Sequence, residues 1–108
     1  MTIQYKNVGI NLTDTATTTI LTSPSSARCL IKQIQVDNSS ASPVSLSVQI
    51  TDSSASASFA ISRKAIAANT VENIITETLV LEESDILKIQ ATAANQITGV
   101  VSILEQRS

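Results

Sequence analysis

The chain lacks most of the residue types on which enzymes rely. Its 108 residues include no histidine, no tryptophan, one cysteine, two glycines and two aromatic side chains, Tyr5 and Phe59. Histidine is the commonest side chain to exchange protons near neutral pH, so its absence excludes a Ser–His–Asp triad and a His-activated cysteine. Two isolated glycines do not form a phosphate-binding loop. The composition therefore predicts a protein that is not an enzyme and binds no cofactor or metal ion.

Charge is scarce as well. Charged residues make up 15% of the chain, the net charge is −2, and the positive charges are scattered singly apart from Arg63 and Lys64. Nucleic-acid binders usually carry a basic stripe, and membrane helices need about 20 consecutive apolar residues; neither feature is present. The first ten residues, MTIQYKNVGI, also lack the pattern of a signal peptide. We therefore expect neither nucleic acid nor membrane as a partner, and synthesis in the cytoplasm.

What the chain does contain is aliphatic and β-branched. Hydrophobic residues make up 43% of the sequence, and most of them are Ile, Val, Leu and Ala. Residues 44–51, VSLSVQIT, alternate between apolar and small polar side chains, the pattern of a strand with one face on a core. Similar runs at 3–12, 17–21, 30–36, 79–81, 86–91 and 97–104 predict further strands. Turn residues separate these runs.

Pairing of the strands follows from the turns. The runs at 30–36 and 44–51, and those at 86–91 and 97–104, are each expected to form an antiparallel hairpin. In the first run Leu30, Ile34 and Val36 share one face while Ile31 lies on the other, which indicates a bulge near Lys32 or a strand covered on both sides. Gly99, in the last run, marks a bulge or a close approach of another backbone segment.

The segment 70–81 is compatible with two structures. Val71, Ile74, Ile75 and Leu79 match helical spacing, but Val71, Ile75 and Leu79 also share one face of a strand with Leu81. The β-branched residues crowded into this segment favour the strand. About seven or eight short strands then predict one all-β domain over residues 1–108, an antiparallel β-sandwich of jelly-roll or Greek-key type.

Two groups with reactive side chains have structural interpretations. Cys29 is flanked by apolar residues and is expected to be a small buried hydrophobe, since the chain offers no histidine to activate it. The acidic run at 82–85 does not have the spacing of a calcium loop and is expected to be a solvated turn between strands.

Surface composition favours an assembled protein. The outward residues of the strand at 44–51 are Ser45, Ser47, Gln49 and Thr51, without a charge, and interface cores are depleted of charge. Arg63 and Lys64 either end a solvated strand or contact an acidic partner, for example the turn at 82–85 of a neighbouring subunit.

The order of these elements resembles that of small virion proteins of tailed phages, especially marine ones. The stretches that carry the resemblance are NVGINLTDTATTTILTS, ARCLIKQIQVDNSSASPVSLSVQITDSS and AIAANTVENIITETLVLEESDILKIQATAANQITGVVSILEQ, which together span nearly the whole chain. The resemblance is a pattern of strands and turns without a diagnostic motif. It implies a capsid decoration (cement) protein, or a neck, tail or fibre-associated component.

The first hypothesis is a non-enzymatic decoration protein that binds the major capsid protein on the outer capsid surface and stabilises the shell. A homotrimer is expected, because an oligomer on a local three-fold axis matches the symmetry of its site. The expected contacts are Ile3, Tyr5 and Val8, the loops at 38–42 and 51–58, and the pair Arg63 and Lys64, with Tyr5 as anchor. A carbohydrate-binding β-sandwich is a third alternative.

Overall fold

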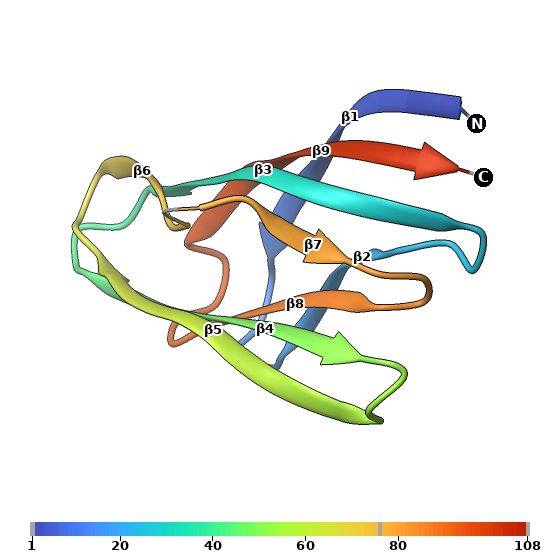
Figure 1. Ribbon diagram of the computed structural model, residues 1–108. Coiled ribbons are helices and arrows are strands. Elements are labelled where there is room, and N and C mark those ends of the chain that lie inside the picture. The colour runs from blue at the N-terminus through green and yellow to red at the C-terminus, as the bar shows by residue number, and fades with distance from the viewer. Residues whose placement is uncertain (1, 76, 108) are drawn as a thin grey trace.

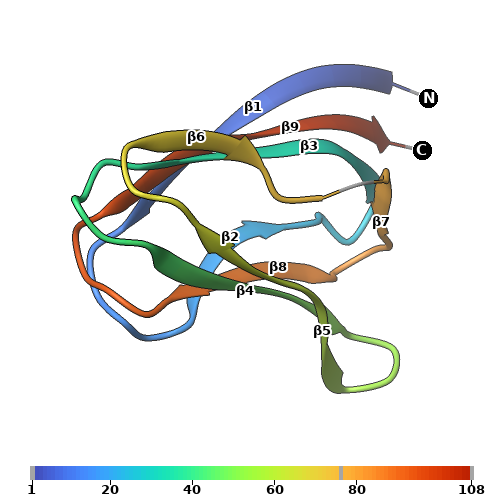
Figure 2. The ribbon, with the colours of Figure 1, turned by 90° about the vertical axis from the view of Figure 1, so that its left-hand side faces the viewer.

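The computed structural model describes residues 2–75 and 77–107, which form nine strands and no helix, so no described helix could cross a membrane. The strands lie in two facing antiparallel sheets (Figures 1 and 2). The first sheet has the order β1 (Thr2–Leu12), β9 (Ile97–Arg107), β3 (Ala27–Asn38) and β6 (Thr70–Asn73), with β7 (Leu79–Leu81) also paired to β3. The second sheet has the order β2 (Thr18–Thr22), β8 (Ile86–Ala91), β4 (Val44–Asp52) and β5 (Ala57–Ile66). The predicted all-β sandwich is confirmed.

The core between the sheets is aliphatic. Val44, Leu46 and Val48 of β4 are buried, as their alternation predicted, and they face a buried row from the first sheet. Burial of a large aliphatic side chain contributes about 1.5–3 kcal/mol. The largest fully buried side chains of the core are Leu12, Ile31, Ile34, Val36, Val48, Ile66, Leu81, Leu87, Ile89, Ile97, Val101 and Ile103.

Both predicted hairpins are wrong. β3 lies in the first sheet and β4 in the second, and β8 and β9 are likewise divided between the sheets. The connection after β3 crosses from one sheet to the other because Asn38 fixes it: its Nδ2 donates to the carbonyl oxygens of Ser42 at 2.9 Å and Ile66 at 3.0 Å. Its Oδ1 accepts the backbone N–H of Ser40 at 3.0 Å. Turn-forming residues suit such a crossing as well as they suit a hairpin.

The bulge near Lys32 is confirmed, but it reverses the predicted faces. The pairing of β3 with β9 shifts between Ile31 and Gln33, so Lys32 is an extra residue. Because one inserted residue switches the alternation, Ile31 joins Ile34 on the buried face. Leu30 lies on the outer face instead and is half-buried.

The segment 70–81 forms two short strands, so the preference for strand over helix is confirmed. Thr76 lies outside the described residues. The prediction that Val71 and Ile75 share one strand face is wrong, because Ile75 is buried whereas Val71 is 56% exposed. The regular strand ends after Asn73, whose Oδ1 accepts the backbone N–H of both Ile34 and Ile75 at 3.3 Å.

Gly99 marks a close backbone approach, one of the two alternatives predicted for it. Gly99 pairs with Ile10 of β1 and Val36 of β3, in the middle of the first sheet. A Cβ atom at this position would overlap the backbone carbonyl oxygen of Gln35. A residue without a side chain is therefore required there.

Candidate interaction surface

An apolar row crosses the outer face of the first sheet. Tyr5 of β1 is directly opposite Leu104 of β9, Leu104 is opposite Leu30 of β3, and Leu30 is opposite Val80 of β7. Directly opposite residues on antiparallel strands have neighbouring side chains on the same face. Tyr5 is 79% and Val80 51% exposed, and the two leucines between them are half-buried. We call these four residues the apolar row.

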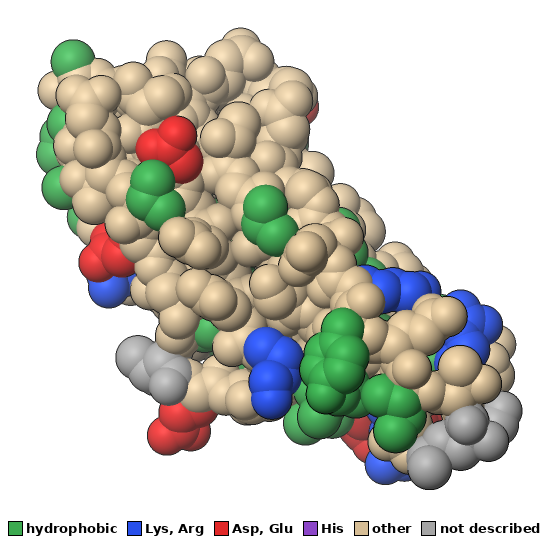
Figure 3. Space-filling view, turned by 90° about the horizontal axis from the view of Figure 1, so that it is seen from above, with side chains coloured by type: hydrophobic (Ala, Val, Ile, Leu, Met, Phe, Trp, Pro, Cys, Tyr) green, Lys and Arg blue, Asp and Glu red, His purple; other side chains and the backbone are tan. Residues whose placement is uncertain are grey.

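The surroundings of the apolar row are polar and partly charged. Arg28 and Lys32 lie on either side of Leu30 in β3 and are exposed, and Lys32 lines a shallow hollow together with Tyr5. Ile3, two residues before Tyr5 and on the same face, is also exposed. Next along β1, Asn7 accepts a hydrogen bond from the hydroxyl of Ser102 at 3.0 Å, which ties β1 to β9 on this face. Figure 3 shows this side of the molecule, with hydrophobic side chains gathered towards its lower right and Lys and Arg side chains beside them. The face is suited to contact another protein surface.

The opposite face of β1 carries a charge network. Lys6 Nζ lies 3.2 Å from Glu105 Oε2, and Arg107 Nε donates to the same oxygen at 2.8 Å. The side chain of Glu105 is 5% exposed. The hydrogen bond from Arg107 and the one from Lys6 lower the pKa of Glu105 below its ordinary value, although burial opposes them. Glu105 therefore stays ionised and holds the first residues of β1 against β9.

The three N-terminal residues predicted as contacts do not lie together. Ile3 and Tyr5 are on the outer face of the first sheet and exposed. Val8 points to the inner face of the sheet, is half-buried and packs against the core. Leu104, Leu30 and Val80, which complete the apolar row, were not predicted as contacts, because only the register across four strands brings them beside Tyr5.

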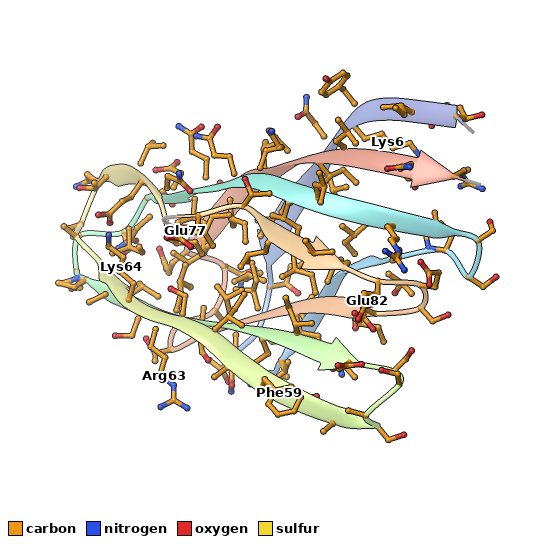
Figure 4. The ribbon with its side chains drawn as sticks, in the orientation of Figure 1. Lys6, Phe59, Arg63, Lys64, Glu77 and Glu82 are labelled. Atoms are coloured by element: carbon orange, nitrogen blue, oxygen red, sulfur yellow. The ribbon has the colours of Figure 1, made fainter. Side chains whose placement is uncertain are left out.

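Arg63 and Lys64 point to opposite sides of β5, as Figure 4 shows. Lys64 Nζ lies 2.9 Å from Glu72 Oε1 of β6, so this pair joins the two sheets. Arg63 faces outwards beside a shallow hollow shared with Ser47 and Gln90, and it forms no ion pair with any described carboxylate. The two residues are adjacent in sequence but do not form one basic patch.

The uncharged strand at 44–51 is not an exposed edge. β4 is paired on both sides, with β8 and with β5, so its backbone needs no further partner. Its outward Ser45 and Ser47 lie on a sheet face instead. The low charge of this strand therefore gives no sign of an open edge to be covered.

The acidic turn after β7 has a structural role. Asp85 is buried and accepts the backbone N–H of Ser53 through Oδ1 and that of Glu82 through Oδ2, each at 3.0 Å. Glu83 accepts a hydrogen bond from Arg28 Nε at 2.6 Å, which lowers the pKa of Glu83. The turn thereby joins the β4–β5 and β7–β8 loops. Among the described residues, no group of three or more potential metal ligands comes together.

Cys29 is a buried small side chain, as predicted, with none of its surface exposed. Its Sγ lies 3.7 Å from the hydroxyl oxygen of Ser23. Burial raises the pKa of the thiol, which disfavours the reactive thiolate.

Comparison with known proteins identifies the fold but no family. No protein-family model matches the chain, and no curated protein matches it. Among solved structures, the Bacillus endospore appendages, described as disulfide-linked pili, align with a TM-score of 0.55 and 14% identity over 99% of this chain and 88% of that one. Eiger TNF from S. frugiperda aligns at 0.53 and 10% identity over 98% and 92%.

A carbohydrate-binding module is similar to the same degree. The C-terminal family 22 carbohydrate binding module of Clostridium thermocellum Xyn10B aligns with a TM-score of 0.52 and 8% identity, covering 97% of this chain and 84% of that one. At such low identities the three proteins share a β-sandwich fold with this chain, and that likeness by itself assigns no activity.

Proposed function

We propose that this chain is a non-enzymatic structural protein of a phage virion, and that it decorates the capsid by binding the outer surface of the shell through the first sheet. The observation that carries this proposal is the apolar row, with Tyr5 79% and Val80 51% exposed at its two ends. An apolar strip exposed across four strands is typical of a surface that is covered in an assembly. The order of the strands and turns in the sequence, which resembles that of small virion proteins, supports a place for the chain in a virion.

Stabilisation of the shell would come from added contact area. A decoration protein that bridges neighbouring capsid subunits raises the free energy needed to separate them. Burial of a large exposed apolar side chain contributes about 2 kcal/mol, so Tyr5 and Val80 would together account for several kcal/mol at each site. Aromatic side chains are frequent among the residues that dominate interface energies, which favours Tyr5 as the anchor.

A neck, tail or fibre-associated position is the alternative within the same class. The apolar row fits a contact with any of these neighbours, so the location on the virion has to be measured. The carbohydrate-binding alternative is less well supported. Sugar sites commonly use aromatic rings, but Tyr5 lies in the first sheet and Phe59 in the second, at opposite edges of the sandwich. The two rings cannot form one platform.

Capsids of the source phage grown without this chain provide the test. The purified protein is added back, and its occupancy and the thermal stability of the capsids are measured. We expect wild-type protein to bind and to raise the disruption temperature, and the double variant Tyr5→Ala/Val80→Ala to bind at least ten-fold more weakly. Phe59→Ala is the matched control, because it removes an exposed ring, 54% accessible, from the other sheet.

Three results would contradict the proposal. The first is absence of the chain from purified virions. The second is immunogold labelling of the chain in virions that is confined to the neck or tail, and the third is equal capsid binding by Tyr5→Ala/Val80→Ala and wild type. The second result would move the assignment to the alternative location.

A further inference from the structure

Within the described part of the chain, the sandwich has four open sides where a strand has no neighbour on its outer edge, and three of these sides are protected against further pairing. β6 has four residues and β7 three, β2 has five with a register irregularity, and β5 has an irregular pairing with β4 and carries Arg63 and Lys64. Short length, bulges and edge charges are the usual means by which proteins block edge-to-edge association.

β1 has the least protection of the four. It is 11 residues long and pairs with β9 from Thr2 to Leu12 without a shift in register. It contains no proline, and its one charge, on Lys6, is engaged by Glu105 of its own chain. A long, regular and nearly uncharged edge strand offers unpaired N–H and C=O groups to another strand.

The first half of β1 also receives little support from the rest of the described chain. Residues 2–7 are exposed on both faces, and β9 is the one strand paired with them. In Figures 1 and 2 this end of β1 lies at the margin of the sandwich, away from the second sheet. A strand end held by one ladder is marginally stable in water, and a second neighbouring strand would stabilise it.

We propose that β1 pairs antiparallel with β1 of a second copy, forming a two-fold dimer with one continuous sheet. The two-fold axis is perpendicular to the sheet, so the outer faces of both copies lie on the same side of the continuous sheet. Odd-numbered residues of β1 then lie opposite odd-numbered residues of the second copy, and even-numbered residues opposite even-numbered ones. If both exposed halves, residues 2–7, are to be covered, the axis passes at Gln4 or at Tyr5. Ile3 then lies opposite Tyr5 of the second copy, or the two Tyr5 side chains meet.

This pairing brings no like charges together and joins apolar side chains to apolar side chains. Lys6 lies opposite Thr2 or Gln4 of the second copy, so no two like charges are directly opposed. With the axis at Tyr5 the apolar row continues directly into the row of the second copy, and with the axis at Gln4 the two rows are joined through Ile3. This inference does not depend on the virion role, and it differs from the trimer that a three-fold capsid site favours.

Cysteine cross-linking tests the pairing and its symmetry. Directly opposite Cα atoms in antiparallel strands are about 4.5–5.5 Å apart, within reach of a disulfide. We expect either Gln4→Cys or Tyr5→Cys to give disulfide-linked dimers on mild oxidation. Asn11→Cys is the matched control, because the two copies of this exposed position would lie more than about 40 Å apart. The native Cys29 does not interfere, since it is fully buried.

A second set of variants separates pairing from chance collision. If the axis passes at Gln4, Ile3→Lys/Tyr5→Lys places four lysines around it and should lower cross-linking of Gln4→Cys at least ten-fold. If the axis passes at Tyr5, Ile3→Lys/Asn7→Lys should do the same for Tyr5→Cys. Val80→Lys should have no such effect in either case. The inference is overturned if Gln4→Cys and Tyr5→Cys cross-link no more than Asn11→Cys, or if the lysine pair matched to the cross-linking cysteine has no effect. A dimer that fails to bind capsids would remove the proposed function and leave this inference intact.

Discussion

Asn38 is the residue whose replacement tests the fold most severely. Its side chain is fully buried where the chain passes from the first sheet to the second, and its Nδ2 donates to the carbonyl oxygens of Ser42 and Ile66. A buried polar group left without its partner costs about 1–3 kcal/mol. Asn38→Ala leaves the Ile66 oxygen without this donor and frees the loop. We therefore expect the free energy of unfolding to fall by about 3 kcal/mol. For a domain of this size that corresponds to a fall in Tm of about 12–24 °C.

Replacement by a carboxylate should be worse at neutral pH. In Asn38→Asp the introduced group still accepts hydrogen bonds from Ser40 but faces carbonyl oxygens with a negative charge. Its pKa in the folded state is therefore raised above the unfolded value, and the variant should gain stability as the pH falls through that raised pKa. Urea unfolding at pH 7 and pH 4 measures both effects, with the exposed Asn11→Ala as control. Unfolding of Asn38→Ala within about 0.5 kcal/mol of wild type would refute the role assigned to Asn38.

Two further predictions concern the first sheet. Gly99→Ala should cost about 1–3 kcal/mol or more, because its Cβ would overlap the Gln35 carbonyl; Gly9→Ala, with no atom within 4 Å of its Cβ, should stay near wild type. Equal urea midpoints for the two variants would contradict this. The lowered pKa of Glu105 means that its charge adds stability above the unfolded value, about 4.5, and that this stability is lost as the pH falls through the lower folded pKa. The difference in unfolding free energy between wild type and Glu105→Gln should accordingly be constant from pH 5 to 8 and shrink in acid. A difference that does not change with pH would refute the stabilising role of the Glu105 charge.

The sequence predicts the strands better than their partners. Alternation in β4 and the extra residue at Lys32 are local patterns, and both were visible in the sequence. The sheet to which a strand belongs is not local: Asn38 directs a crossing through contacts with Ile66, 28 residues away. A turn-rich sequence carries no sign of such a contact.

The same limit applies to the interaction surface. Tyr5 stands out in the sequence because aromatic residues are rare in this chain. Leu30, Val80 and Leu104 do not stand out among many aliphatic residues, and they become neighbours of Tyr5 only through three successive pairings. Conversely, Arg63 and Lys64 are adjacent in sequence, but strand alternation points them to opposite sides.

The solution mass of the purified chain, measured by light scattering over a wide range of concentration, tests most directly the claim that the β1 edge of the first sheet binds a second copy of the chain. The β1 pairing predicts twice the 11.4 kDa of one chain at high concentration and a return to the single-chain mass in Ile3→Lys/Tyr5→Lys. A trimer would favour the three-fold capsid site over the β1 pair. A mass of one chain at every concentration would contradict self-association through β1.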